Sequence, residues 1–288
     1  MPHKVPWGVA GALLAVIGVS GCDSEEKASR IVKDTDDEAV VELGDGRQVS
    51  LRYRQGTGLV ERHRSTADAP WSEPRTLYAT RTEPCTGIDL NARHGTVAVR
   101  ADFAAYCRDG EPPAETVAAV GAGEFEKWDT HVSEDWDGWD RVRIAGDGRS
   151  ATFATKTWSS GTTVKWRAGR GFGAEHTAYK RLGERFLGTW RATDGSHRLT
   201  FRQAGPDRPA GLTVETLKGT ACTVRMDVQN IWKDTVEPDE AELVRGRKTV
   251  NCPAPEFDSK YVLKAPDGEM RLQELVEPPK TLATYRKE

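Results

Sequence analysis

One stretch of the chain concentrates side chains that are capable of chemistry. Residues 128–140 read WDTHVSEDWDGWD and contain three Trp, one His and five acidic residues in 13 positions. An exposed Trp ring can stack on a pyranose while neighbouring carboxylates accept hydrogen bonds from its hydroxyl groups. On this hypothesis the candidate ligand-binding residues are Trp136 and Trp139, together with Asp135 and Asp137.

Two other interpretations of the same stretch stay open. A calcium loop would use the carboxylates, but calcium takes about six to eight oxygen ligands, and the Asp-x-Asp-x-Asp-Gly spacing of an EF-hand is not met. Alternatively, the Trp side chains pack into a core while the acidic residues face solvent. We expect this core arrangement for at least one of Trp136 and Trp139.

The sequence contains none of the common catalytic or cofactor motifs. His63, His94, His131, His176 and His197 are scattered without a His-Glu-x-x-His element, and neither a Gly-x-Ser-x-Gly elbow nor a phosphate-binding P-loop occurs. We therefore expect no metal, no cofactor, no catalytic residue and no enzymatic activity. A glycan-directed hydrolase stays the alternative, because its two carboxylates are usually distant in sequence.

The N-terminus carries an export signal. Lys4 precedes an apolar run of 11 residues at positions 9–19 (VAGALLAVIGV). As a helix this run would reach only roughly 16 Å, which is too short for a hydrocarbon core of about 30 Å. A positive start followed by a short apolar run predicts a signal peptide over residues 1–21.

The residues that close this run, Val19-Ser20-Gly21-Cys22, resemble the lipobox of bacterial lipoprotein precursors. The resemblance implies cleavage before Cys22 and attachment of acyl chains such as palmitate to its thiol. Several acyl chains hold a protein durably on a membrane. We therefore expect an extracytoplasmic protein that is anchored by lipid to the cell membrane.

The charge of the mature chain argues against a nucleic-acid partner. Lys4 is the only charged residue before Cys22, so the mature chain has 40 Lys and Arg against 44 Asp and Glu, a net charge of −4. No basic stripe is present to displace counterions from a phosphate backbone. Residues 22–39 are rich in charge and poor in apolar side chains, which predicts a solvated, lipidated tether.

Four cysteines follow the lipid anchor, at Cys85, Cys107, Cys222 and Cys252. Outside the cytoplasm an even number of cysteines favours disulfide bonds, and proximity favours pairing Cys85 with Cys107 and Cys222 with Cys252. Each bridge would be worth on the order of 3 kcal/mol in the chain-entropy account. A four-cysteine zinc site is the rival interpretation, but no two of these cysteines have the short spacing that such sites use.

Asp-Gly pairs between alternating segments predict an all-β fold, because both residues tolerate the positive φ of tight hairpin turns. Two further segments, residues 96–103 (TVAVRADF) and 222–228 (CTVRMDV), place apolar residues at alternate positions. Long helical periodicity is absent. The four pairs are Asp45-Gly46, Asp147-Gly148, Asp194-Gly195 and Asp267-Gly268.

A domain boundary is expected near residues 181–186, after the glycine-rich stretch 169–173. Residues 40–180 would form one β domain and residues 186–288 a second, smaller antiparallel sheet or barrel. Each unit would then contain one of the two disulfides. Each is also long enough to enclose a modest core.

Both units contain short segments that resemble known folds. Trp71-Ser72-Glu73-Pro74 and the run from Ser133 to Trp139 resemble the Asp-box signatures of sialidase-like β-propellers, although about 140 residues suffice for only about three blades. A β-sandwich fits this length equally well. Gly188-Thr189-Trp190 resembles the Gly-x-Trp opening of lipocalin-type barrels, which implies either a ligand-enclosing barrel or a small, filled sheet or barrel.

Together these observations predict a non-catalytic binding or scaffolding module of the cell envelope. The membrane is expected to be one partner, through the lipid, and an envelope protein or glycan another. The alternatives are the glycan-directed, sialidase-like hydrolase and a small-ligand-binding β-barrel lipoprotein.

Overall fold

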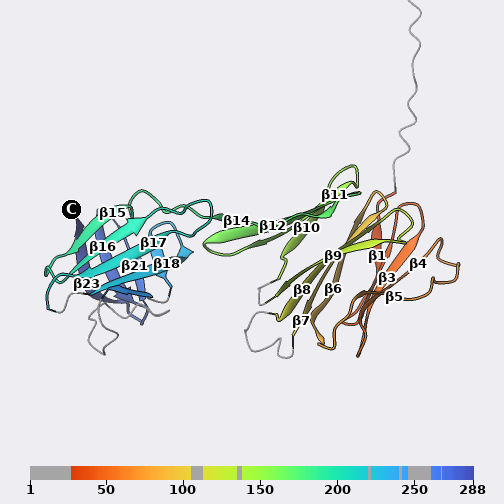
Figure 1. The fold of residues 1–288 in the computed structure, drawn as a ribbon, viewed down its shortest axis with the longest axis horizontal. Coiled ribbons are helices and arrows are strands. Elements are labelled where there is room, and N and C mark those ends of the chain that lie inside the picture. The colour runs from red at the N-terminus through yellow and green to blue at the C-terminus, as the bar shows by residue number, and fades with distance from the viewer. Residues whose placement is uncertain are drawn as a thin grey trace, which may run out of the picture.

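The computed structural model describes residues 27–104, 113–134, 138–219, 222–239, 242–245, 261–266 and 268–288. These residues form 23 β-strands and no helix, so the prediction of an all-β protein is confirmed. The described chain accordingly offers no helix with the length and apolarity to cross a membrane. Figure 1 shows layered sheets at one end of the molecule and a barrel at the other, with β12 (Ser160–Arg167) and β14 (His176–Tyr179) reaching between them.

Three antiparallel sheets follow one another along the chain. The first contains β1 (Arg30–Asp34), β2 (Glu38–Glu42), β3 (Gln48–Arg54), β4 (Gly58–Arg64) and β5 (Arg75–Tyr78). The second contains β6 (Pro84–Arg93), β7 (Thr96–Phe103), β8 (Glu115–Ala122) and β9 (Trp128–Glu134). The third contains β10 (Arg141–Ile144), β11 (Ser150–Lys156), β12, β13 (Gly171–Phe172) and β14.

These three sheets stack face to face, with the second sheet in the middle. On β7, Val97 and Val99 pack against the first sheet, whereas Ala98 packs against the third. Successive side chains of a strand point to opposite faces, so a strand that is buried on both faces lacks polar alternation. Burial on both faces explains why β8 is apolar almost throughout. The three stacked sheets form three layers instead of a two-sheet sandwich.

The last sheet closes on itself as an eight-stranded antiparallel barrel. Each barrel strand pairs with its neighbours along the chain, and β15 pairs with β23 to complete the ring. A ninth strand, β20, pairs with β18 beside the ring. The strands are β15 (Gly188–Ala192), β16 (His197–Arg202), β17 (Gly211–Thr216), β18 (Thr223–Ile231), β19 (Thr235–Pro238), β20 (Glu242–Arg245), β21 (Tyr261–Lys264), β22 (Glu269–Glu274) and β23 (Lys280–Lys287).

Large side chains fill the barrel interior. Trp190 of the Gly-x-Trp segment is 1% exposed, and its Nε1 donates to the carbonyl oxygen of Phe186 at 2.9 Å. Tyr285 is fully buried in the same core. A small barrel packed in this way matches the filled alternative predicted for this unit. Other fully buried side chains of this core are Phe186, Leu199, Leu212, Met226 and Leu263.

Asp-Gly pairs form the hairpin turns where the sequence predicts them. Gly46, Gly148, Gly195 and Gly268 all have positive φ, and each lies between consecutive paired strands. The Asp side chain supports the turn in three of these hairpins by accepting the backbone N–H two residues later, at 2.8–3.0 Å. Asp267, the acidic residue of the fourth pair, lies outside the described residues.

The folded body begins earlier than the predicted tether allows. Within residues 22–39, β1 pairs with β2, and Ala39 is 1% exposed in the core. The tether prediction is therefore wrong for residues 30–39. Its charged residues fit a strand because β1 is an edge strand whose residues are all exposed. At the other expected boundary, the third sheet ends at Tyr179 and the barrel begins at Gly188.

Candidate functional site

The Trp-rich stretch that the sequence singles out is largely structural in its described part. Trp139 is only 4% exposed, and its ring meets Phe153 edge-on at 6.2 Å between the second and third sheets. It offers no open face to a sugar, which corrects the ligand-binding hypothesis at this position. Asp135, Trp136 and Asp137 lie outside the described residues.

Polar side chains of the same stretch bind other parts of the fold. Asp129 accepts a hydrogen bond from the indole Nε1 of Trp166 at 2.7 Å. His131 and Ser133 both contact Glu175 Oε1, at 2.7 and 2.6 Å, which ties β9 to the segment before β14. These contacts connect the second sheet to the third. The described residues also contain no cluster of three metal-ligating side chains.

The cysteines are described only in part. Cys85 in β6 and Cys222 before β18 are both disulfide-bonded. Cys107 and Cys252, their expected partners, lie outside the described residues, as does Cys22, the predicted lipidation residue. The pairing and the lipid attachment stay predictions.

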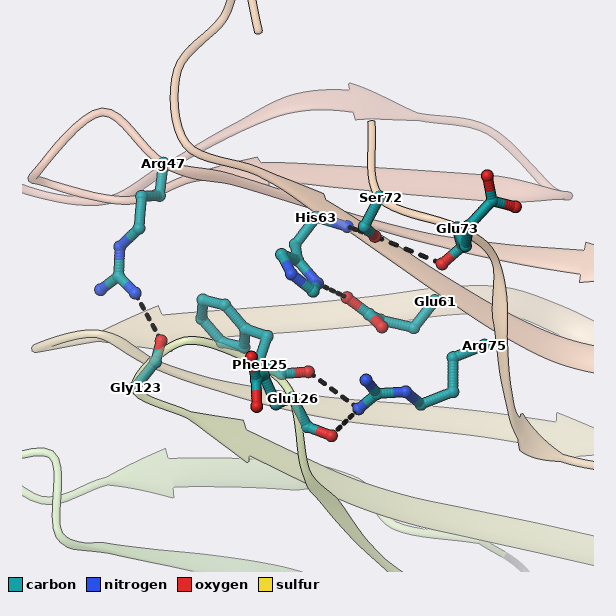
Figure 2. Close-up of polar contacts among 9 residues, drawn as sticks. All are labelled: Arg47, Glu61, His63, Ser72, Glu73, Arg75, Gly123, Phe125 and Glu126. Atoms are coloured by element: carbon teal, nitrogen blue, oxygen red, sulfur yellow. Dashed lines mark hydrogen bonds and ion pairs between the residues drawn. The ribbon is translucent and has the colours of Figure 1, made fainter. Parts of the chain in front are cut away.

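A buried carboxyl group that the sequence analysis overlooked lies on β4 (Figure 2). The Glu61 side chain is 1% exposed, and its Oε1 lies 2.8 Å from Nδ1 of His63. Burial raises the pKa of Glu61, while the His63 hydrogen bond and the charge of Arg75 oppose the rise. Its second oxygen, Oε2, is buried and has no hydrogen-bond partner in the described structure.

The surroundings of Glu61 indicate a joint between sheets rather than a catalytic centre. Arg75 donates to the carbonyl oxygens of Phe125 and Glu126 in the turn between β8 and β9 (Figure 2). The Ser72 hydroxyl accepts from the backbone N–H of His63 at 3.0 Å, not from the imidazole ring. No Ser–His nucleophile pair therefore forms here.

A surface groove beside the barrel has a different character. It has a volume of about 530 Å³ and lies on the third sheet, where β10, β11, β12 and β14 meet the turn after β11. We call it the junction groove. Its lining residues are Arg141, Ala154, Thr155, Lys156, Thr157, Trp158, Ser160, Gly161, Thr163, Ala178, Tyr179 and Lys180.

Trp158 is the most exposed large aromatic side chain of the described structure, at 61%. It lies in the turn between β11 and β12, and the Thr157 hydroxyl fixes this turn by accepting the backbone N–H of Ser160 at 3.0 Å. The Trp158 ring lies 5.9 Å from that of Trp232, which follows β18 in the barrel. The two rings, from sequence positions far apart, thus form one aromatic surface.

Contacts next to this aromatic pair join the third sheet to the barrel. Lys180, just after β14, donates from Nζ to the backbone carbonyl of Ile231 at 2.5 Å. Its own backbone N–H donates to Ser159 in the Trp158 turn. The groove therefore lies on the third sheet, next to the point where Lys180 and Trp158 contact the barrel.

The junction groove is positively charged although the whole chain is net negative. Arg141, Lys156 and Lys180 line it, and among the described residues no Asp or Glu does. The adjacent Asp140 carboxylate accepts from the Thr155 hydroxyl and from the backbone N–H of Lys156, at 3.0 and 2.9 Å. The exposed Trp158 ring can stack on a flat or cyclic ligand, and the three cations beside it can attract the ligand's negative charge.

Sequence reasoning misses this groove because its parts are separated along the chain. The local signal is the segment KTWSSGT at positions 156–162, which places a Trp in a hairpin turn. A turn residue has no strand neighbours to cover a large ring, so exposure is the expected result. Trp232 and Lys180 carry no signal that would place them beside Trp158.

Comparisons with known proteins add little to this geometry. No family model and no curated protein matches the chain. Among solved structures, a proposed 6-phosphogluconolactonase from Bacteroides fragilis is similar at 10% identity and a TM-score of 0.20, over 84% of this chain and 82% of that one. A TM-score this low carries no argument about fold or activity.

Proposed function

We propose that this protein is a lipid-anchored, non-catalytic binding module of the cell envelope, which holds an envelope glycan in the junction groove. The signal peptide and the Val19-Ser20-Gly21-Cys22 segment support export and anchoring. The observation that carries the binding role is the 61% exposed ring of Trp158, which lies 5.9 Å from the tilted ring of Trp232. Large exposed aromatic groups in a concave surface are typical of binding sites.

The absence of carboxylates from the groove lining favours binding over hydrolysis. Most glycoside hydrolases need two carboxyl groups that flank the scissile bond, one to donate a proton and one to attack or to activate water. The described part of the lining supplies Arg141, Lys156 and Lys180 but no acidic residue. The filled barrel likewise favours the junction groove over the barrel interior as the ligand site.

Envelope retention tests the binding role. Full-length protein in detergent would be mixed with delipidated cell-wall polysaccharide from the producing bacterium, and the retained fraction measured. Replacing Trp158 by Ala is expected to weaken retention about ten-fold, as expected for loss of a central aromatic contact. Trp71→Ala is the matched control, because Trp71 lies against Arg62 and Arg64 on the first sheet, away from the groove. Equal retention of Trp158→Ala and the parent protein would refute the proposal.

The anchor is tested separately with the Cys22→Ser variant. Metabolic labelling with a palmitate analogue should mark the parent protein and leave the variant unlabelled. The variant is expected either to be released from membranes or to stay unprocessed. Persistent label on Cys22→Ser would overturn the lipoprotein assignment.

A further inference from the structure

We infer that the junction groove selects acidic glycans, whose sugar rings stack on the Trp158–Trp232 surface while their anionic groups lie near its three cations. This inference rests on the proposed function and deepens it by naming the ligand class. It depends on a juxtaposition within one groove, because Trp158 shares the lining with Arg141, Lys156 and Lys180.

Charge complementarity is the first argument. The chain as a whole has a formal net charge of −3, yet the groove has three cations and no acidic residue among the described residues that line it. Arg141, Lys156 and Lys180 are all exposed. A concave, cationic surface on a net-negative protein attracts anions locally while the remaining surface repels them. A neutral glycan can accept hydrogen bonds from these three side chains but lacks the charge attraction that an acidic one adds.

Aromatic geometry is the second argument. Trp158 and Trp232 are inclined by 40° to each other, so their rings do not form a closed, parallel stack. Trp158 comes from the third sheet and Trp232 from the barrel, and the groove continues over Ala154, Gly161 and Ala178, which have little or no side chain. A ring-containing polymer can lie over such a low floor and reach Trp158, next to which Trp232 lies.

Binding to matched neutral and acidic sugars tests the inference. Calorimetric titrations would use full-length protein with hexagalacturonate and with its fully methyl-esterified form, which has the same backbone without the charge. A phosphodiester-linked sugar oligomer in a further titration distinguishes phosphate from carboxylate as the preferred anion. At least one acidic oligomer should bind about ten-fold more tightly than the neutral ester, with an affinity that falls as salt rises.

Variants assign the effect to the groove. Lys156→Gln is expected to weaken acidic-sugar binding several-fold and to reduce its salt dependence, because it removes one facing charge. Lys127→Gln is the matched control, since the Lys127 side chain is 86% exposed in the turn before β9 and lies outside the groove lining. Trp158→Phe, which keeps an aromatic ring, should bind more tightly than Trp158→Ala.

Three outcomes would overturn the inference: equal affinity for the neutral ester, no binding of either acidic oligomer, or equally tight binding of an octathymidylate. The last would indicate a general polyanion surface. Envelope retention that depends on Trp158 without preference for acidic sugars would leave the proposed function standing while this inference falls.

Discussion

Glu61 and His63 lie two residues apart on one face of β4 and share a hydrogen bond of 2.8 Å between Oε1 and Nδ1, with the carboxyl group 1% exposed. Alternation along a strand places both side chains on the face that packs toward the second sheet. Burial raises the pKa of Glu61 above its usual 4.5. The protonation state of this carboxyl group is therefore linked to the stability of the fold.

Replacing Glu61 by Gln should flatten the dependence of stability on pH. Because the pKa of Glu61 is raised in the fold, the folded protein binds more protons than the unfolded chain above pH 4.5. The Glu61 carboxyl group therefore stabilises the folded protein below pH 4.5, and this stabilisation is lost as pH rises through its raised pKa. Melting temperatures of Glu61→Gln should fall less than those of the parent as pH rises from about 4.5.

Glu175→Gln is the control with the opposite sign. Burial acts to raise the pKa of Glu175, but the hydrogen bonds from Ser133 and His131 outweigh it, and the pKa is lowered overall. Glu175 therefore stabilises the fold at pH values above its pKa in the unfolded chain. This stabilisation is lost as pH falls through its lower pKa in the folded protein. Glu175→Gln should therefore change the melting temperature only at the acidic end of the pH range. Identical profiles for Glu61→Gln and the parent would contradict the linkage.

Two neighbouring glycines should respond differently to Ala. Gly56 and Gly58 both have positive φ, at 74° and 103°. A Cβ at Gly56 meets nothing within 4 Å, whereas a Cβ at Gly58 would lie 2.2 Å from the carbonyl oxygen of Tyr78. Gly56→Ala should cost about 1 kcal/mol from backbone strain alone. Gly58→Ala adds a clash with backbone and should cost about 3 kcal/mol or more.

Urea denaturation of both glycine variants measures this difference. The midpoint should move slightly for Gly56→Ala and strongly for Gly58→Ala. Similar midpoints would mean that β5 moves away from β4 at little cost, contrary to the close backbone approach at Gly58.

Local signals predicted much of the fold. At Asp45-Gly46 and Asp147-Gly148 the turn residues specify both the conformation and the supporting side-chain hydrogen bond, so the hairpins follow from adjacent residues. The 96–103 segment likewise forms β7 over the whole predicted range. At β1 the charged residues predicted a tether where the structure has a strand, because an edge strand tolerates full exposure of its side chains.

The site depends on contacts that no local signal encodes. Trp158 and Trp232 come from different sheets, and only the packing of the third sheet beside the barrel brings their rings to 5.9 Å. Glu61 likewise carries no local signal of burial, since charged residues usually face solvent. Its burial follows from the second sheet, whose turn at Phe125 and Glu126 binds Arg75 close by.

The disulfides should follow the division between the layered sheets and the barrel. Cys85 belongs to the second sheet and Cys222 borders the barrel, and both are disulfide-bonded. We predict bridges from Cys85 to Cys107 and from Cys222 to Cys252, with no free thiol in the mature, lipidated protein. Peptide mapping without reductant should recover these two linked pairs. A peptide joining Cys107 to Cys222 would contradict both the pairing and the division.

Ala variants of Trp139 and Trp158 should have opposite effects: one should lower stability and the other should lower glycan binding. Trp139 is 4% exposed and packs on Phe153, so Trp139→Ala should cost about 3 to 5 kcal/mol, a large share of the roughly 5 to 15 kcal/mol that stabilises a domain. Trp158 is 61% exposed, so Trp158→Ala should change the free energy of unfolding by only about 0.5 kcal/mol. Denaturant titrations measure both changes, and glycan binding measured on the same samples should be lost for Trp158→Ala at nearly unchanged stability. A melting curve of Trp139→Ala that matched the parent would show that this ring is not part of the core. A strongly destabilised Trp158→Ala would mean that the contact between Trp158 and Trp232 mainly holds the barrel to the third sheet.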